Sequence, residues 1–389
     1  MKRINLAFFI FAASSVAFYA CKKNSVADEM TSASEDFSAS SNLRQNNSAG
    51  AVYVLSNAAD GNKVLVFKRG SDGHLTGSSN YATGGNGTGA GLGSQGAVIL
   101  QQYNGTDFVF AVNAGSNDVT VFKAEGTKLT WIDKQSSHGT LPISITAHDN
   151  LLYVLNAGGD GNISGFRIST DGHLHYLTNS SKTLSTNNAG PAEIKFNNQG
   201  KQLVVTEKNT NSISTYTVYE NGLTSKAVVH ASVGTTPFGF AFNNKDQLLV
   251  TDAFGGAAGQ SAVTSYNLNN NGNLSLIEGP EATHQTSACW LAVTNNGKYC
   301  YAANTGSGTI SGYRVGNDGS LALLNSDGVT ATTGITPGDI TLSVNSKFLY
   351  NLNSTSHSIT LFSVNEDGSL DAIGTVDGVP AGAVGIAAK

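Results

Sequence analysis

The feature that most constrains the fold of this chain is a pattern that recurs seven times between Val52 and Ile373. Each copy contains a short apolar strand, a polar loop that opens on Asn, Asp or Glu, a second strand of alternating polarity, a turn that often carries Asp-Gly, and a third strand. A repeat of this kind predicts stacked supersecondary units that bury their faces against one another. The copies begin at Val52, Phe108, Leu152, Leu203, Leu248, Tyr299 and Phe348.

A fourth apolar strand precedes six of the seven copies, which is typical of propeller blades. These strands are GAVIL at Gly96, ISITAH at Ile143, EIKFN at Glu193, FGFAF at Phe238, WLAVT at Trp290 and DITLSV at Asp339. The first copy lacks such a strand, whereas AVGIAAK, from Ala383 to Lys389, follows the last copy without a partner. We expect this segment to close the ring as the inner strand of blade one, because closure removes two exposed sheet edges.

The sequence therefore predicts an all-β, seven-bladed β-propeller of four-stranded blades over residues 51–389. A row of sandwich domains is the alternative, but no linker precedes any copy and each copy has too few strands to bury both faces alone. The 45 glycines and the low share of charged residues, 13%, favour tight turns over long helices. The net charge of −5, with both signs scattered, gives no basic patch, so we expect no nucleic-acid partner and a monomer.

The N-terminal segment has the layout of a targeting signal. Lys2 and Arg3 precede an apolar run that ends at Ala20 and Cys21. This predicts a signal peptide over residues 1–20 and resembles the lipobox of bacterial lipoproteins, in which Cys21 would be lipidated. Residues 21–50 are rich in Ser, Asn, Ala and Glu and are predicted to be a flexible tether. A short transmembrane anchor is the alternative. We expect a cell-envelope location facing the periplasm, with the lipid anchor as the only membrane contact.

Cys289 and Cys300 are the two cysteines of the predicted propeller. If residues 288–294 and 298–304 pair as a hairpin, Cys300 lies opposite Val293. The two thiols are then about four residues apart along the ladder, roughly 13 Å, which is too far for a disulfide. We predict two free and mostly buried thiols.

Two positions per blade are expected to converge on one opening of the central channel. The inner strand of each blade begins there, and the loop after the second strand returns there; such openings commonly hold ligands. The first set contains Gln95 to Ala97, Ser144, Glu193, Gly239, Trp290, Asp339 and Gly382. The second set contains Asn57, Asn113, Asn156, Glu207 with Lys208, Asp252, Asn304 and Asn353.

Four of these residues are carboxylates, and two carboxylates with different surroundings can act as an acid and a base. Burial near Trp290 would raise the pKa of one, and Lys208, the one cation among these positions, would keep another ionised. Glu193 and Asp339 are the candidate catalytic residues. The candidates for ligand binding are Gln95, Glu207, Lys208, Asp252, Trp290 and Asn304. The alternative is structural, because Asp and Glu cap turns at strand ends, and Asn in five blades suggests a repeated turn role.

The residues indicate no resident cofactor, although carboxylate and amide oxygens at the channel mouth are ligands that Ca²⁺ prefers. His173 and His175 fall on one face of a strand, but they supply only two metal ligands and no third is near in the repeat. Trp290 is suited either to stacking on a ring-shaped ligand or to packing within its inner strand.

The glycine-rich segment GGNGTGAGLGSQG, residues 84–96, contains a match to the G-x-G-x-x-[GA] turn of dinucleotide-binding folds. That turn needs a helix after it, whereas the residues that follow, AVILQQ, are predicted to form the inner strand of blade two. We therefore expect the segment to lie over the channel mouth as a lid, with backbone N–H groups that could hold an anion or carboxylate.

Several stretches, NAGSNDVTVF, YAANTGSGTISGY, TTPFGFAF and the closing GIAAK, resemble the seven-bladed propeller lactonase family, described as 3-carboxymuconate cyclase or 6-phosphogluconolactonase-like. The resemblance extends from about Ala51 to Lys389 and implies lactone chemistry. Members with that chemistry typically carry His or Arg after a Pro at the start of inner strands. The matching positions here are Ser144, Glu193, Gly239 and Asp339, so no catalytic residue is carried over from the family.

Two functions therefore remain open. As an enzyme, the protein would hydrolyse or form a sugar-acid or muconate-type lactone, with Glu193 or Asp339 activating water or moving a proton and Lys208 steadying the carboxylate. As a binding module, it would present the same opening to a glycan, a peptide or a protein of the cell envelope. The missing His and Arg favour binding, and the resemblance favours lactone chemistry.

Overall fold

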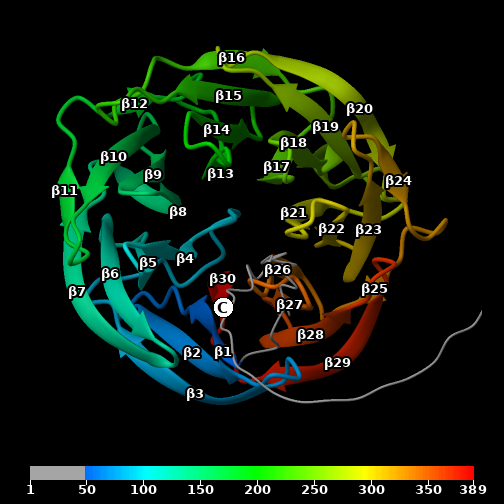
Figure 1. Cartoon of the computed structure of the whole chain (residues 1–389), viewed down its shortest axis with the longest axis horizontal. Coiled ribbons are helices and arrows are strands. Elements are labelled where there is room, and N and C mark those ends of the chain that lie inside the picture. The colour runs from blue at the N-terminus through cyan, green and yellow to red at the C-terminus, as the bar shows by residue number, and fades with distance from the viewer. Residues whose placement is uncertain (1–48) are drawn as a thin grey trace, which may run out of the picture. The chain divides into compact units, whose positions relative to one another are not determined.

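The computed structural model describes residues 49–389, which form a closed ring of seven antiparallel sheets around a central channel (Figure 1). The predicted all-β propeller is confirmed. The predicted signal peptide, the predicted lipidation site at Cys21 and nearly all of the predicted tether lie outside the described residues. Within residues 49–389, no helix has the length and apolar character needed to cross a membrane.

Each blade contains four strand positions, which run in chain order from the channel outward in blades two to seven. Blade one contains β1 (Gly50–Leu55), β2 (Lys63–Arg69), β3 (Leu75–Ala82) and β30 (Val384–Ala388). Blade two contains β4 (Val98–Tyr103), β5 (Thr106–Asn113), β6 (Asp118–Glu125) and β7 (Lys128–Ser136). Blade three contains β8 (Thr140–His148), β9 (Leu151–Gly158), β10 (Asn162–Ile168) and an outer position split into β11 (Leu174–Tyr176) and β12 (Lys182–Thr183).

The remaining four blades repeat this order. Blade four contains β13 (Pro191–Phe196), β14 (Gln202–Glu207), β15 (Ser212–Thr217) and β16 (Val228–Ala231). Blade five contains β17 (Pro237–Phe242), β18 (Gln247–Asp252), β19 (Ala262–Leu268) and β20 (Leu274–Ala282), with a short 3₁₀ turn, η1 (Phe254–Gly256). Blade six contains β21 (Ala288–Val293), β22 (Tyr299–Asn304), β23 (Thr309–Val315), β24 (Leu321–Leu323) and β25 (Ala331–Thr332). Blade seven contains β26 (Pro337–Leu342), β27 (Phe348–Asn353), β28 (Ser358–Val364) and β29 (Leu370–Asp377).

The C-terminal strand closes the ring as predicted. β30 pairs antiparallel with β1, with Val52 opposite Ala388 and Val54 opposite Ile386. Blade one is therefore the sheet β3-β2-β1-β30, built from both ends of the described chain. The inner strand of blade two begins at Val98, two residues later than the expected Gly96.

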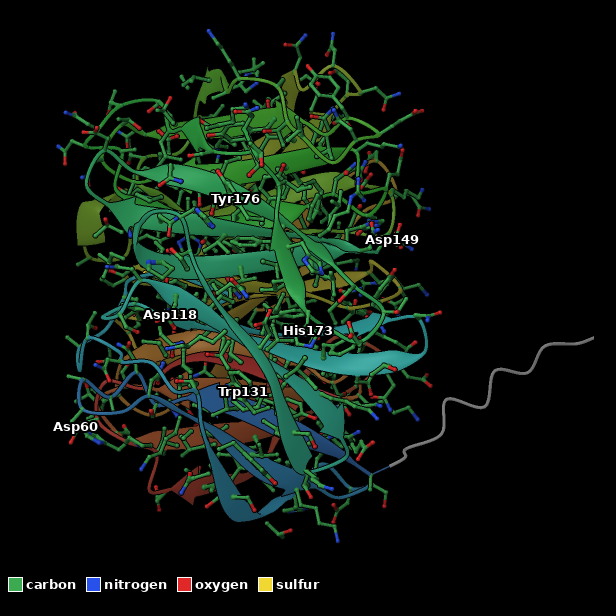
Figure 2. The ribbon with its side chains drawn as sticks, turned by 90° about the vertical axis from the view of Figure 1, so that its left-hand side faces the viewer. Asp60, Asp118, Trp131, Asp149, His173 and Tyr176 are labelled. Atoms are coloured by element: carbon green, nitrogen blue, oxygen red, sulfur yellow. The ribbon has the colours of Figure 1, made fainter. Side chains whose placement is uncertain are left out.

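Burial decreases along each blade from the second strand to the outer strand. The second strands are almost completely buried on both faces, because each packs between the neighbouring blades, and they read as short continuous apolar runs. An outer strand such as β3 is exposed over most of its length. Figure 2 shows Trp131 of the outer strand β7 at the periphery of the ring, where its side chain is about half exposed.

Buried tyrosines of the second strands join neighbouring blades. In four blades, a tyrosine hydroxyl donates a hydrogen bond to a glycine carbonyl in the outer turn of the next blade, which satisfies a buried polar group. The pairs are Tyr53 with Gly126 (3.0 Å), Tyr153 with Gly222 (2.7 Å), Tyr301 with Gly368 (2.9 Å) and Tyr350 with Gly73 (2.8 Å).

The cysteine prediction is confirmed. β21 and β22 pair as a hairpin in which Cys300 lies opposite Val293. Both Cys289 and Cys300 are buried and free of a disulfide. Burial raises the pKa of the Cys289 thiol to about 11, so it is protonated and unreactive near neutral pH.

Candidate active site

The central channel is divided into two cavities. We call the face of the ring at which the inner strands begin the start face, and the opposite face the end face. A cavity of about 360 Å³ is lined at its base by Gln95, Glu193 and Asp339. Its lining continues to Val344, which is 62% exposed at the end of an inner strand, so this central cavity opens on the end face. A second cavity of about 410 Å³ lies at the start face.

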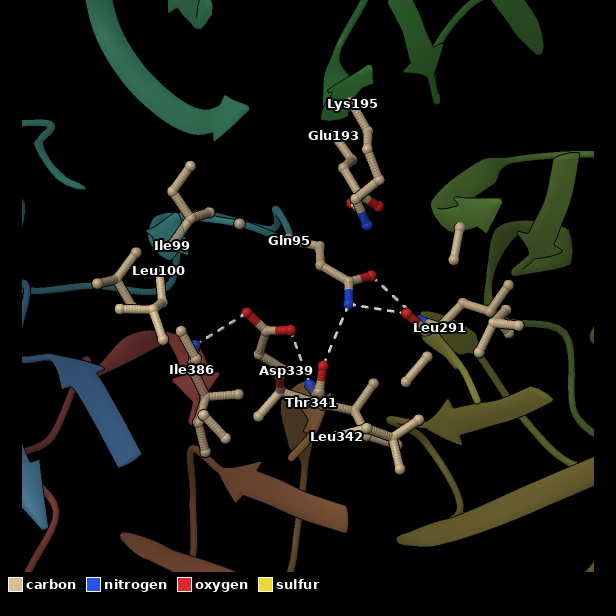
Figure 3. Close-up of a pocket in the computed structure, with 18 of the residues that line it drawn as sticks. Gln95, Ile99, Leu100, Glu193, Lys195, Leu291, Asp339, Thr341, Leu342 and Ile386 are labelled. Carbon is tan, nitrogen blue, oxygen red and sulfur yellow. Dashed lines mark hydrogen bonds and ion pairs between the residues drawn. The ribbon is translucent and has the colours of Figure 1, made fainter. Parts of the chain in front are cut away.

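The glycine-rich segment forms the partition between these cavities. Ser94 lines the start-face cavity, whereas the next residue, Gln95, lines the central cavity. The Ser94 hydroxyl donates to Ile143 O at 2.8 Å, and the buried Gln95 amide reaches across the channel (Figure 3). β4 follows this segment, so no helix is present for a dinucleotide-binding turn. The expected opening was the start face, but the segment closes the channel there and the carboxylates are reached from the end face.

A ring of side chains joins the inner strands around the channel. Near the start of an inner strand, an oxygen accepts a hydrogen bond from a backbone N–H of the next blade. The three pairs are Ser144 with Ile194 (3.2 Å), Glu193 with Phe240 (2.7 Å) and Asp339 with Ile386 (3.2 Å). These bonds satisfy buried N–H groups, so both candidate catalytic residues also have a structural role.

Blade five breaks this pattern because its residue at the same place is Gly239. The glutamine of the partition takes over: Gln95 Oε1 accepts from Leu291 N at 3.1 Å, and Gln95 Nε2 donates to Leu291 O at 3.0 Å and to Ile340 O at 3.3 Å. A Cβ atom on Gly239 would lie 2.3 Å from Gln95 Oε1. The same Cβ atom would lie 2.7 Å from the backbone oxygen of Cys289, which cannot move aside as the end of a glutamine side chain can, so glycine is required there.

Glu193 and Lys195 form an ion pair at the base of the central cavity. The two residues are separated by one residue on β13, so strand alternation places their side chains on the same side. Lys195 Nζ is 2.7 Å from Glu193 Oε1 and donates to Phe240 O at 3.1 Å. Burial raises the pKa of Glu193, and Lys195 and the Phe240 N–H oppose that rise. The carboxylate is buried, whereas the Lys195 side chain is 37% exposed toward the cavity.

Asp339 lies across the channel from this pair (Figure 3). Its Oδ1 accepts from Ile340 N at 2.7 Å and its Oδ2 accepts from Ile386 N at 3.2 Å. Burial raises the pKa of Asp339 to about 8, and the negative charge of Glu193 adds to the rise, while the two N–H groups and Lys195 oppose it. A carboxyl group with such a pKa can accept or release a proton near neutral pH.

The prediction for Lys208 was wrong in its geometry. Lys195, not Lys208, is the cation beside a candidate catalytic carboxylate. Lys208 Nζ instead donates to Gly93 O at 2.6 Å and lies 4.6 Å from the centre of the Phe238 ring. Burial lowers the pKa of Lys208 to about 8. Lys208 therefore holds the partition in place. The missed residue, Lys195, could have been found from its i, i+2 spacing to Glu193.

The structure does not bring Glu207, Asp252 and Asn304 to either cavity. Each lies at the end of a second strand and bonds a Ser or Thr hydroxyl of the third strand in its own blade. The corresponding pairs are Asn113 with Thr120, Asn156 with Ser164, Glu207 with Ser214, Asp252 with Thr264, Asn304 with Ser311 and Asn353 with Thr360. The structural alternative therefore fits these residues, because their side chains hydrogen-bond the second strand to the third.

Trp290 lies at the start face rather than beside the carboxylates. Its indole Nε1 donates to Pro337 O at 2.9 Å, and its ring packs edge-on against Phe238 at 5.1 Å between centres. The side chain is 5% exposed and lines the start-face cavity. Trp290 is thus packed in the inner ring and also forms part of a cavity wall.

The described residues contain no group of three or more His, Cys, Asp or Glu side chains that could hold a metal ion. His173 Nδ1 lies 3.8 Å from Asp133 Oδ2 in the neighbouring blade, at the periphery (Figure 2). The two carboxylates of the central cavity bind backbone N–H groups and Lys195.

Seven four-stranded blades around a channel define the class of this protein as a seven-bladed β-propeller. Residues 160–253 and 252–337 match the family model described as lactonase, 7-bladed β-propeller. This match confirms, over residues 160–337, the resemblance predicted from the repeats. No curated protein matches the chain.

Solved structures with this architecture cover nearly all of the described ring. A structure described as a putative 6-phosphogluconolactonase from Bacteroides fragilis is 17% identical, with a TM-score of 0.63, and covers 87% of this chain and 97% of that one. The periplasmic gluconolactonase of Pseudomonas aeruginosa is 15% identical, with a TM-score of 0.65, and covers 86% of this chain and 98% of that one. At these identities the likeness shows the fold.

Proposed function

We propose that the protein hydrolyses a lactone in the central cavity, with Asp339 as general base and Lys195 as the group that stabilises the oxyanion. The proposal rests on one observation. The carboxyl group of Asp339, with a pKa of about 8, and the ammonium group of Lys195 line the same central cavity. The family match supports lactone chemistry. As substrate class we propose a sugar-acid or muconate-type lactone.

The reaction needs two proton transfers at Asp339. The Asp339 carboxylate takes a proton from water, and the water oxygen attacks the ring carbonyl carbon. Lys195 stabilises the negative charge that develops on the carbonyl oxygen. The bond between the carbonyl carbon and the ring oxygen then breaks, and the ring oxygen takes the proton from Asp339. The hydroxy acid leaves, and the carboxylate is restored.

Glu193 acts in this scheme as a positioning residue. Its carboxylate holds Lys195 Nζ at 2.7 Å and is itself held by Phe240 N at 2.7 Å. An ammonium fixed in this way needs little reorganisation when charge develops beside it. Lys195, rather than Lys208, is thus the cation beside a candidate catalytic carboxylate in this scheme.

The test is a lactone panel assayed with wild type, Asp339→Asn and Lys195→Met. We expect kcat/KM to fall at least about 100-fold in each variant, the usual effect of removing a general base or an oxyanion-stabilising group. Ser144→Ala is the matched control, because Ser144 also accepts an inter-blade hydrogen bond but lines neither cavity. Full activity in Asp339→Asn would overturn the mechanism.

The pH dependence gives a second measurement. Because the deprotonated form of Asp339 is required, kcat/KM should rise with pH and level off above about 8. The rate of spontaneous lactone hydrolysis is subtracted at every pH. Asp339→Asn should lose this rise. The profile is measured from about pH 6 to about pH 9, on both sides of the pKa of Asp339. A flat wild-type profile over this range would contradict the assignment.

A binding propeller is the second candidate, and one observation favours it. Glu193, Asp339 and Gln95 all hold inter-blade hydrogen bonds, so their presence has a structural explanation without turnover. In this version the protein recognises a glycan, a peptide or a protein of the cell envelope. Absence of turnover of every lactone in the panel, by a folded wild-type protein, would favour this candidate.

We also propose that the propeller is lipid-anchored at Cys21 in the cell envelope and faces the periplasm. The basic residues Lys2 and Arg3, the apolar run and the cysteine support this proposal. Cys21→Ser should release the protein from the membrane fraction into the soluble periplasmic fraction. Unchanged fractionation of this variant would contradict lipidation.

A further inference from the structure

We propose that the start-face cavity is a second binding site, which takes a neutral saccharide. This cavity of about 410 Å³ falls within the range of small-molecule sites, about 300 to 1,000 Å³. It is separated from the central cavity by the partition at Ser94 and Gln95. The proposal goes beyond lactone hydrolysis, because no group of the proposed catalytic mechanism lines this cavity.

The lack of Asp, Glu, Lys and Arg side chains in the lining of the start-face cavity favours a neutral ligand. No Asp, Glu, Lys or Arg side chain lines the start-face cavity, and His357 is its one titratable residue. The ammonium groups that contact the glycine-rich segment already have partners: that of Lys208 donates to Gly93 O and lies over the Phe238 ring, and that of Lys134 donates to Gly84 O. A carboxylate or phosphate ligand would therefore have no free cation to pair with and would depend on the backbone N–H groups of the segment alone.

The hydroxyl groups of the lining offer acceptors for ligand hydroxyls. Thr305 Oγ1 donates to Pro337 O at 2.8 Å, and Ser354 Oγ donates to Thr336 O at 3.1 Å. A hydroxyl that has committed its proton still has lone pairs to accept a hydrogen bond. Both oxygens are therefore fixed as acceptors at the cavity wall.

The glycine-rich segment offers matching donors on the other side. Residues 89–94 line the cavity. Within the described part of the chain, the backbone N–H groups of residues 91–94 donate to no protein acceptor, whereas those of Gly87 and Gly89 bind Ala58 O and Asn57 O. Each hydroxyl of a saccharide is both a donor and an acceptor, so it can bridge this segment and the opposite wall. Trp290 and Ala383 supply apolar wall for the C–H face of a sugar ring.

The experiment uses the fluorescence of Trp290 as reporter. The chain has two tryptophans, and Trp131, on the outer strand β7, is the other. In a Trp131→Phe background, we expect methyl glucoside, N-acetylglucosamine or maltose to change Trp290 emission in a saturable manner. Glucuronate and glucose 6-phosphate should bind at least about tenfold more weakly, which corresponds to about 1.4 kcal/mol.

A cavity-filling variant tests the location. Thr355 is exposed and lines the cavity, so Thr355→Phe should weaken saccharide binding at least about tenfold without loss of the fold. Asn209→Phe is the matched control, because Asn209 is an exposed residue of the corresponding loop in blade four but does not line the cavity. If Thr355→Phe fails to fold, Ser354→Ala removes one acceptor and should weaken binding about fivefold.

Three results would overturn the proposal: no saturable change with any of the three neutral saccharides, tighter binding of the charged sugars, or equal binding by wild type and Thr355→Phe. Saccharide binding should persist in Asp339→Asn, because Asp339 lies on the other side of the partition. Loss of lactone turnover and loss of saccharide binding are therefore measured independently.

Discussion

At the scale of single residues, the ends of the second strands show how one position is reused with different chemistry. Five blades place Asn there, and in four of them its amide binds a third-strand hydroxyl. Blade five has Asp252, which is fully buried; its Oδ2 accepts from Thr264 at 2.5 Å, and its Oδ1 has no hydrogen-bond partner. Burial raises the pKa of Asp252 from 3.8 to about 7.

Replacing this carboxyl group by the amide used in the other blades should stabilise the protein. The folded state of wild type holds the proton of Asp252 up to about pH 7, whereas the unfolded state releases it near pH 3.8. Stability of wild type therefore falls as pH rises through this window and stays low above it. Asp252→Asn should remove this fall, with a gain approaching about 4 kcal/mol above pH 7. Denaturant unfolding at pH 4 and pH 8 measures it.

The reverse change provides the matched control. Asn304 occupies the same place in blade six and is also fully buried. Asn304→Asp should destabilise the protein more at pH 8 than at pH 4, for the same reason. Equal effects at both pH values in either variant would show that the buried carboxyl group is not the cause.

At the scale of elements, the partition segment completes an inner ring that the repeat leaves open at Gly239. Gln95→Ala should leave Leu291 N–H and two carbonyl groups without partners and should open a passage between the two cavities. We expect a loss of about 2 to 3 kcal/mol in the free energy of unfolding, the cost of unsatisfied buried polar groups. Gln102→Ala, at an exposed residue of the adjoining strand β4, is the control and should change stability little. Equal stability of the two variants would contradict the role of Gln95.

The same elements show what could be predicted from the sequence. The strands, the closure by β30 and the separation of Cys289 from Cys300 follow from local patterns and a repeat, so each was accessible. The partners of Gln95 are 196 and 245 residues away, and nothing local specifies them. For the same reason the sequence predicted that the carboxylates would be reached from the start face. The glycine-rich segment closes that face, so the cavity with Glu193 and Asp339 opens on the end face. Glu193 and Asp339 were found, but Lys195 was overlooked and Lys208 was misplaced.

At the scale of the whole molecule, the stability of each blade depends on its contacts with the two blades beside it in the closed ring. Turns on the end face link successive blades: Asn198 donates to Asn243 O at 2.6 Å, Asn244 to Asn296 O at 2.9 Å, and Asn295 N to Ser346 Oγ at 2.9 Å. The tyrosine pairs add contacts at four of the seven blade boundaries. A break at one blade boundary therefore removes support from both of its neighbours.

Removal of residues 384–389 should destabilise the entire ring. It deletes a strand whose five residues are all buried and leaves the inner edge of β1 unpaired. The lost burial corresponds to about 5 kcal/mol or more, so the thermal midpoint should fall and aggregation through the exposed edge should increase. Removal of Lys389 alone is the milder control, because it costs the ion pair with Asp107 and the backbone hydrogen bonds with Ala51 O and Arg69 Nε but leaves β30 in place. An unchanged midpoint after the six-residue deletion would contradict closure by β30.

Blade one contains the first and the last strands of the described chain, so it is the last blade to be completed during synthesis. Blades two to seven are each continuous in the chain, so each has all of its strands as soon as its last residue has left the ribosome. β1, although made first, must wait for β30, more than 300 residues later, and its unpaired edge is open to other chains meanwhile. A chain that ends before residue 384 is therefore expected to hold six complete blades and one unpaired strand edge at β1, which is open to pairing with another chain.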